Sequence, residues 1–323
     1  MRNFKILKTI IFCVVVIILT FLINYLLVPF SSVDVHFAEF HQAEKNGNID
    51  ILITGSSLET NGLKADVIET ETGLHTCNFS PHGGFPESSY LLLLDSSIRN
   101  DIKVAIVGWD ILQNMQVPKY VYPNREELYR NLFADIKADA SLGSLVIKGM
   151  AAQRFTYSFF KFASFPENIN CLKEVRDSWN KDISIEKIDN NKLHINEEEL
   201  KSSDKYHFYK VTQRTYTDTI YEEDRLYFKK MKELCDEKGI RLFAISCPAP
   251  SCVVAAIPNF EQMHNAAKTM FCELGIDYID GFNQNIFERS LETSNFSDCF
   301  GHLVSPYNVE YSRTVGRIIR SLN

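Results

Sequence analysis

The sequence predicts an α/β protein built on a parallel sheet with right-handed crossovers. Short β-branched runs alternate with longer segments of helical period, first in residues 49–110 and again after residue 221. Each run ends in a polar or glycine-containing turn, as parallel strands do before a crossover helix. The 323 residues, 45% of them hydrophobic, suffice for one large α/β domain with an inserted segment.

The first thirty residues predict a membrane anchor. Residues 1–8 form a basic tail without acids, and residues 9–30 are almost wholly apolar. At about 1.5 Å per residue this run crosses a bilayer of roughly 30 Å. The basic tail keeps the N-terminus cytoplasmic and predicts that the rest of the chain is extracytoplasmic. A cleaved signal peptide is the alternative, disfavoured because the run is long and no A-x-A-like site follows.

Residues 31–48 are predicted to be a juxtamembrane linker, with a helical turn or two within 36–44. The domain then occupies residues 49–323. Its first part holds predicted strands at 49–54, 75–80 and 102–107, with predicted helices at 58–72 and 87–98.

Residues 113–216 break this rhythm, because they are rich in Phe, Tyr, Lys and Asn. Their clearest periodic piece is a predicted helix over 124–138, and residues 183–205 have the polarity of a surface loop. We interpret the stretch as an insertion or lid over the sheet edge. Its aromatic residues favour packed structure over a poorly ordered excursion.

The alternation returns after the insertion. A loop is expected over residues 295–305. The other predicted elements are helices at 222–238, 259–274 and 306–322, and strands at 241–246 and 277–279.

Composition excludes several classes of function. The formal net charge is −7, and no basic stripe with interleaved aromatics is present, so no nucleic-acid partner is expected. None of the eight cysteines forms a C-x-x-C pair, and their spacing is poor for zinc. No cofactor is expected.

The stretch 50–59 predicts a nucleophile. It reads as a buried strand that runs into Gly-Ser-Ser and then a helix, at the sheet edge where α/β proteins bind ligands. A hydroxyl there can act as a serine nucleophile, and we expect Ser57 to carry that role. The alternative is a turn whose serines only cap a helix.

Acyl transfer also needs a base, a group that orients it, and donors for an oxyanion. His302 is the candidate base and Asp298 the candidate orienting group. Gly83 and Gly84 follow the second strand, where a backbone N–H can approach a ligand, and Asp110 follows the third. The carboxyl ends of parallel strands would gather these residues at one edge.

This order of motifs resembles the SGNH (GDSL-like) hydrolase superfamily over residues 49–110 and 222–320. Within it, the chain is similar to membrane-anchored members such as D-alanyl-lipoteichoic acid transfer proteins and partners of membrane-bound O-acyltransferases. The resemblance implies a flavodoxin-like three-layer α/β/α fold. It also implies Ser57 as nucleophile, Ser56 in place of the family's Asp, and Gly83 or Gly84 as an oxyanion donor beside the Ser57 N–H.

Two motifs depart from the family pattern. Asp110 stands where the family has Asn, and an ionised carboxylate repels an oxyanion that an amide would stabilise. Three residues, not two, separate Asp298 from His302, so that in strict register Cys299 replaces the acid. A bulge at Gly301 would bring Asp298 back to the imidazole.

The predicted function is therefore a membrane-anchored serine O-acyl esterase or acyltransferase with a Ser57–His302–Asp298 triad. Its expected substrate is a cell-surface polysaccharide or teichoic-acid-like polymer. A noncatalytic surface protein that binds such a polymer, or that partners a membrane O-acyltransferase, is the main alternative. A metal site at Asp298, Cys299 and His302 is a weaker one, because the ligands are few and bunched.

Overall fold

The computed structural model describes residues 32–119 and 196–322, together with residues 8, 10–12, 14–16 and 18–19. The predicted helix at 124–138, most of the insertion and most of the predicted anchor at 9–30 lie outside this part. Within it, no helix has both the length and the apolar character needed to cross a bilayer. The chain divides into two compact units, and the α/β domain belongs to the unit formed by residues 36–125 and 186–323.

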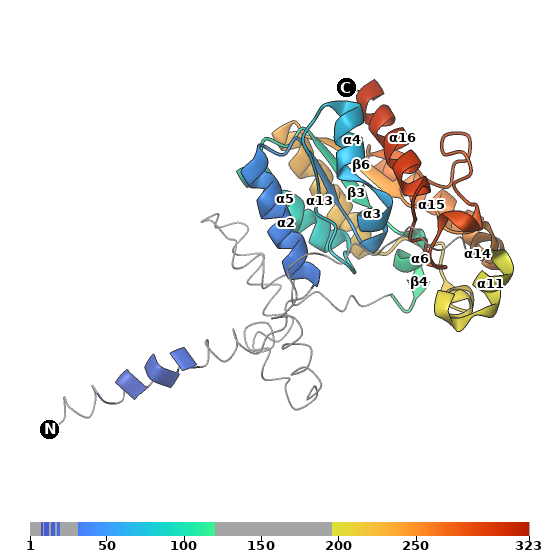
Figure 1. Ribbon diagram of the computed structural model, residues 1–323, viewed down its shortest axis with the longest axis horizontal. Coiled ribbons are helices and arrows are strands. Elements are labelled where there is room, and N and C mark those ends of the chain that lie inside the picture. The colour runs from blue at the N-terminus through green and yellow to red at the C-terminus, as the bar shows by residue number, and fades with distance from the viewer. Residues whose placement is uncertain are drawn as a thin grey trace. The chain divides into compact units, whose positions relative to one another are not determined.

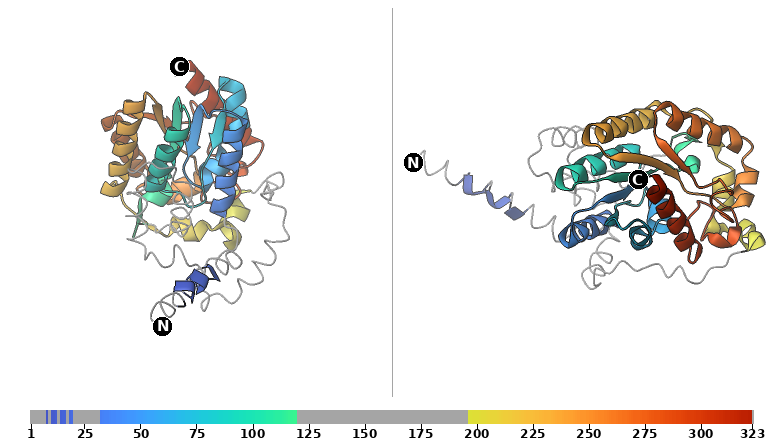
Figure 2. Two further views of the ribbon diagram at one scale, coloured as in Figure 1. Left: turned by 90° about the vertical axis from the view of Figure 1, so that its left-hand side faces the viewer. Right: turned by 90° about the horizontal axis from the view of Figure 1, so that it is seen from above.

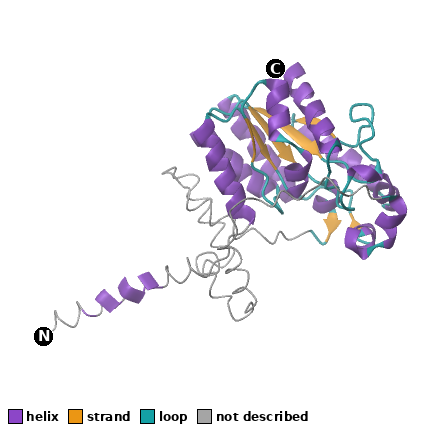
Figure 3. Cartoon of the chain, viewed as in Figure 1, coloured by secondary structure: helices purple, strands orange, loops and turns teal. Residues whose placement is uncertain are grey.

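A parallel sheet of five strands forms the centre of the domain (Figure 3). Its order is β2-β1-β3-β6-β7, so the chain moves outward from β1 to β2 and then crosses back to β3. Ligands bind beside such a reversal, at the carboxyl ends of the strands. The strands are β1 (Ile51–Thr54), β2 (Thr76–Asn78), β3 (Val104–Gly108), β6 (Arg241–Ser246) and β7 (Asp277–Asp280).

Helices cover both faces of this sheet, which confirms the predicted α/β class (Figures 1 and 2). Ile51 and Ile53 point to one face and pack in the same cluster as Val315 of the terminal helix. That face carries α3 (Ser57–Gly62), α4 (Ala65–Thr72) and α16 (Tyr307–Leu322). The other carries α5 (Pro86–Arg99), α13 (Glu222–Lys238) and α15 (Phe260–Glu273).

The predicted linker at 31–48 is largely a helix, α2 (Ser32–Asn46), which packs at the β2 edge of the sheet. Phe37 and Phe40 lie three residues apart, so they share one face of the helix. Both are buried against Phe79, with ring centroids 4.8 Å and 4.4 Å away. The linker prediction was wrong here because the partner of this apolar face lies some forty residues downstream.

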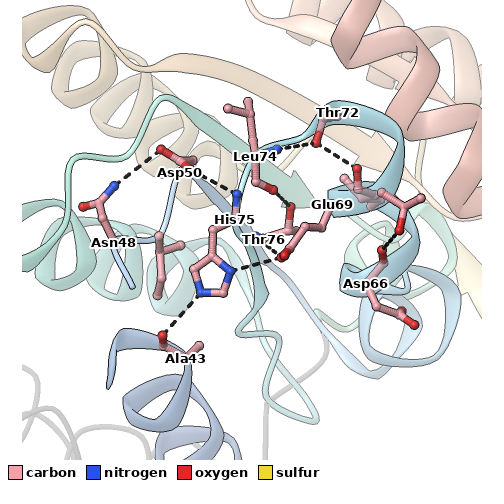
Figure 4. Close-up of polar contacts among 12 residues, drawn as sticks. Ala43, Asn48, Asp50, Asp66, Glu69, Thr72, Leu74, His75 and Thr76 are labelled. Carbon is pink, nitrogen blue, oxygen red and sulfur yellow. Dashed lines mark hydrogen bonds and ion pairs between the residues drawn. The ribbon is translucent and has the colours of Figure 1, made fainter. Parts of the chain in front are cut away.

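The far end of α2 is held at the amino ends of β1 and β2. The His75 ring lies between Ala43 and Glu69, with its Nε2 3.3 Å from the Ala43 carbonyl oxygen and its Nδ1 3.0 Å from Glu69 Oε2 (Figure 4). The His75 N–H donates to Asp50. These contacts join α2, α4 and the first two strands into one body.

The predicted helix at 58–72 is interrupted between α3 and α4. Leu63 has an extended backbone, and tertiary contacts satisfy the groups that the break frees. The Lys64 N–H donates to Ser312 Oγ of α16, and the Asn78 amide donates to the Leu63 carbonyl. A sequence pattern of helical period does not reveal such distant partners.

The insertion begins and ends at a two-stranded antiparallel ribbon. β4 (Gln116–Val117) pairs with β5 (Thr215–Tyr216), which brings the two ends of the segment together. Before β5 lie α11 (Glu197–Ser202), a 3-10 turn and α12 (Phe208–Thr212), so the predicted surface loop is partly helical. The short helices α6 (Ile111–Asn114) and α14 (Ser251–Ala256) were not expected from the sequence.

Candidate active site

The turn after β1 assigns different roles to its two serines. Ser56 is the N-cap of α3: its hydroxyl accepts from the Leu58 N–H at 3.1 Å, and Glu59 completes a capping box. Ser57 is the next residue, and its Oγ lies 2.7 Å from His302 Nε2. The capping role predicted as an alternative for this turn thus belongs to Ser56, while the Ser57 hydroxyl meets the imidazole.

His302 is oriented by Asp298. Its Nδ1 lies 2.6 Å from Asp298 Oδ2, while Asp298 Oδ1 accepts from the backbone N–H groups of Phe300, Gly301 and His302 at 3.0–3.3 Å. The backbone bends at Gly301, where φ is +107°, so the acid reaches the ring across three intervening residues. This loop packs closely on the turn after β6, since a Cβ at Gly301 would stand 2.5 Å from the Pro248 carbonyl oxygen.

The charges of this pair suit a general base. Burial would raise the pKa of Asp298, but the hydrogen bond and charge of His302 hold that pKa below its usual range. Burial would lower the pKa of His302, yet Asp298 raises it, with smaller contributions from Asp110 and Glu59. An ionised Asp298 accepts the Nδ1 proton, so neutral His302 presents a free Nε2 lone pair to the Ser57 hydroxyl.

A buried carboxyl group packs against the turn that carries Ser57. Glu59 is 1% exposed and accepts from the Ser56 N–H at 2.6 Å. Side chains at Gly55 or Gly108 would fill its space, since a Cβ there would lie 2.3 Å and 2.0 Å from Glu59 atoms. Burial raises the pKa of Glu59 despite the hydrogen bond that the Ser56 N–H donates to it.

A thiol contacts the same carboxyl group. Cys247 Sγ lies 3.6 Å from Glu59 Oε1. Burial, with the charge of Glu59, raises the pKa of Cys247 well above its usual value. A thiol held protonated in this way donates a hydrogen bond and is no nucleophile.

Asp110 lies at the end of β3, beside the turn that follows β1. It is 9% exposed and caps α6, with Oδ1 accepting from the Leu112 N–H at 2.9 Å. Burial and the charge of Glu59 raise the pKa of Asp110 to about 7, against the opposing effects of backbone donors and His302. Near neutral pH a large share of Asp110 is therefore uncharged, and a protonated carboxyl group can donate a hydrogen bond.

The backbone donors near Ser57 are unequal. The Gly84 N–H donates to the Pro81 carbonyl at 3.0 Å and closes a turn. In the part of the chain that the structure describes, the N–H groups of Ser57 and Gly83 have no hydrogen-bond acceptor. Of the two glycines predicted as oxyanion donors, Gly83 therefore has the available N–H, while Gly84 supplies close packing.

Several residues around the triad were not singled out from the sequence. Burial raises the pKa of Tyr216, which lies at the end of the insertion. Arg214 opposes this effect, and the charge of Asp110 adds to it. Burial lowers the pKa of His82, and the charge of His302 lowers it further. The sequence did indicate that His82, in the Gly-Gly loop, could contact a ligand, whereas Arg214 and Tyr216 lie in a segment without a motif.

Metal ligands are not gathered in the described residues, which contain no group of three His, Cys, Asp or Glu side chains able to hold an ion. The six described cysteines are free thiols. Burial raises the pKa of Cys299 to about 12, and the side chain that meets the imidazole is Asp298. The serine, imidazole and carboxylate in line form an arrangement for acyl transfer.

Comparison with protein-family models and with curated proteins finds no match to the chain.

Proposed function

We propose that the protein is a serine-dependent O-acyl esterase or acyltransferase. The contact chain from Ser57 through His302 to Asp298, at 2.7 Å and 2.6 Å, carries this proposal. His302 takes the Ser57 proton as Oγ attacks the acyl carbonyl, and returns it to the departing alcohol. Water or a glycan hydroxyl then takes the acyl group from Ser57, with His302 again accepting and returning a proton.

The strand order and the site support a place among SGNH-like hydrolases. The five strands follow the 2-1-3-4-5 order of flavodoxin-like folds, and the nucleophile, Asp110 and the Asp298–His302 loop come from the segments that carry the resemblance. Anchored through residues 9–30, the domain would work outside the cytoplasm on a cell-surface polysaccharide or teichoic-acid-like polymer, beside a membrane-bound O-acyltransferase.

A fluorophosphonate probe tests the reaction directly. The full-length protein should become labelled on Ser57, while Ser57→Ala and His302→Ala should lose the label. Ser56→Ala is the matched control: it removes a neighbouring hydroxyl and costs about 1 kcal/mol of stability as a lost N-cap, but should still be labelled. Labelling that persists in Ser57→Ala would contradict the proposal.

The noncatalytic alternative makes the opposite prediction. If the protein only binds a polymer or a membrane partner, Ser57→Ala should restore function in a deletion strain as well as the wild type does. Loss of complementation with Ser57→Ala, but not with Ser56→Ala, favours catalysis.

A further inference from the structure

A cluster of cationic and aromatic side chains lies on the loop that joins Asp298 to His302. We call His207, Lys210, Arg214 and Phe300 the Phe300 cluster. Arg214 Cζ and Lys210 Nζ lie 5.4 Å and 5.8 Å from the centre of the Phe300 ring, and the His207 ring centroid is 5.5 Å from it. Phe300 is itself only part-buried, so the ring and its cations lie near the surface.

This cluster is tied to the catalytic loop by its backbone. The Phe300 N–H donates to Asp298 Oδ1 at 3.0 Å, while the same carboxylate contacts His302 through Oδ2. The Cys299 N–H donates to the Tyr206 carbonyl at 3.1 Å, which holds the segment before α12 against the loop. The cluster therefore packs on the loop that carries the candidate base and its carboxylate.

The charge of the cluster is not balanced within the described residues. Residues 205–214 hold three lysine or arginine side chains and no acid, in a chain whose formal net charge is −7. Cations elsewhere on the domain form ion pairs, for example Lys232 with Asp236 and Arg241 with Asp277. Across the described part of the chain, Lys210 and Arg214 form none.

Packing alone gives a weaker account of this arrangement. A cation over an exposed aromatic ring contributes about 0.5–1 kcal/mol, so one such contact could help hold α12 on the loop. Two cations near one ring repel each other, and a bound anion would offset that repulsion. Arg214 and Asp110 both act on Tyr216, with opposite effects on its pKa.

We infer that the Phe300 cluster binds an anionic group of the substrate, a phosphate or a carboxylate, close to the ester that Ser57 attacks. The inference rests on the proposed function and specifies its substrate class: an acylated alcohol that carries negative charge near the acylated position. Lys210 and Arg214 supply the charge, and Arg214 can also make paired hydrogen bonds to either anion.

Acetyl esters of different charge test the inference on the full-length protein. The set is the monoacetate of glycerol, acetylated glycerol 3-phosphate, O-acetyl-lactate and acetylcholine, with acetate release followed by NMR. We expect kcat/KM for the phosphate or the carboxylate ester to exceed that for the neutral ester by about 5–10-fold at low salt, and acetylcholine to be the poorest. The preference should shrink in about 0.5 M NaCl, because salt screens exposed charges.

Lys210→Gln/Arg214→Gln should lose this preference while keeping hydrolysis of the glycerol ester, which also reports that the variant is folded. Lys229→Gln/Arg317→Gln removes the same two charges from exposed positions on α13 and α16 and should keep the preference. Lys210→Arg/Arg214→Lys should also keep it.

The outcomes separate the inference from the function. Hydrolysis of all four esters at similar kcat/KM, or a preference that survives in Lys210→Gln/Arg214→Gln, overturns the anionic subsite and leaves the esterase standing. A preference for only one of the two anions identifies which group the cluster binds. Hydrolysis of none of the esters contradicts the inference, and a Ser57 that also fails to take the fluorophosphonate label contradicts the proposed function as well.

Discussion

At the scale of single residues, several ionisable side chains of the site lie close enough to change one another's pKa. Glu59, Asp110 and Asp298 all influence His302. Asp298 is held ionised by its contact with the imidazole, whereas burial and Glu59 raise the pKa of Asp110 to about 7. Asp110 is thus neutral below this pH and charged above it, at a position where a charge would repel an oxyanion.

Asp110→Asn should therefore change the pH dependence of ester hydrolysis. Rising pH deprotonates His302, which creates the base, and also deprotonates Asp110, which places a negative charge at the site. Wild-type kcat/KM should rise and then fall above about pH 7. Asn cannot ionise and still caps α6, so the falling limb should vanish, with about 10-fold higher activity than wild type at pH 8.

The rising limb should move to lower pH in the same variant, because the share of Asp110 that is ionised near pH 7 raises the pKa of His302, and Asn carries no charge. Asp277→Asn, an exposed carboxylate at the start of β7, is the control and should leave the profile unchanged. Activity of Asp110→Asn below wild type at every pH would show that the ionised carboxylate has a different use.

At the scale of elements, the site depends on how closely the turns after β1 and β2 approach each other. A Cβ at Gly84 would stand 1.6 Å from the Gly55 carbonyl oxygen, and a backbone atom cannot move aside as a side chain can. This contact keeps the Gly83 N–H beside the nucleophile turn.

Gly84→Ala should displace the loop and cost more than about 2 kcal/mol of stability, measured by urea unfolding. Its kcat/KM for an acetyl ester should fall under conditions where the protein is folded. Gly73→Ala is the matched control: Gly73 has φ +72° but open space around it, so it should lose about 1–2 kcal/mol of stability and retain kcat/KM. Equal activity in both variants would argue against a positioning role for this loop.

At the scale of the whole molecule, α2 determines where the folded domain begins. Phe37 and Phe40 are buried against Phe79, so the helix belongs to the domain and is no spacer. His36 of α2 also meets His82 of the Gly-Gly loop, with ring centroids 5.4 Å apart. The chain therefore enters the domain near the carboxyl ends of the strands, where the candidate active site lies.

Two truncations separate the proposed anchor from the domain. Removal of residues 1–30 should move the protein from the membrane fraction to the soluble fraction, with ester hydrolysis and thermal stability retained. Removal of residues 1–47 should destabilise it strongly, because each buried phenylalanine contributes about 3–5 kcal/mol. The first variant remaining in the membrane fraction would contradict the anchor, and equal stability of the two would contradict the role of α2.

Local sequence signals were enough to predict several elements of the fold. The helix at 222–238 and the strand at 241–246 coincide with α13 and β6, since their apolar period and the Gly239 cap are local signals. The Gly-Ser-Ser turn and the Asp298–His302 loop could be picked out in the same way. Local signals failed at Leu63 and over α2, where Ser312 and Phe79 supply partners from distant parts of the chain.

The sequence by itself determined the α/β class, the strand-end turns and the residue types able to perform acyl transfer. Only the tertiary structure decided which serine meets the imidazole and whether Asp298 reaches it. It also decided that Asp110 shares its space with Glu59 and that residues 207–214 approach Phe300. The physical reason is distance along the chain: Ser57 and His302 are 245 residues apart, and only the order of the sheet brings them to 2.7 Å.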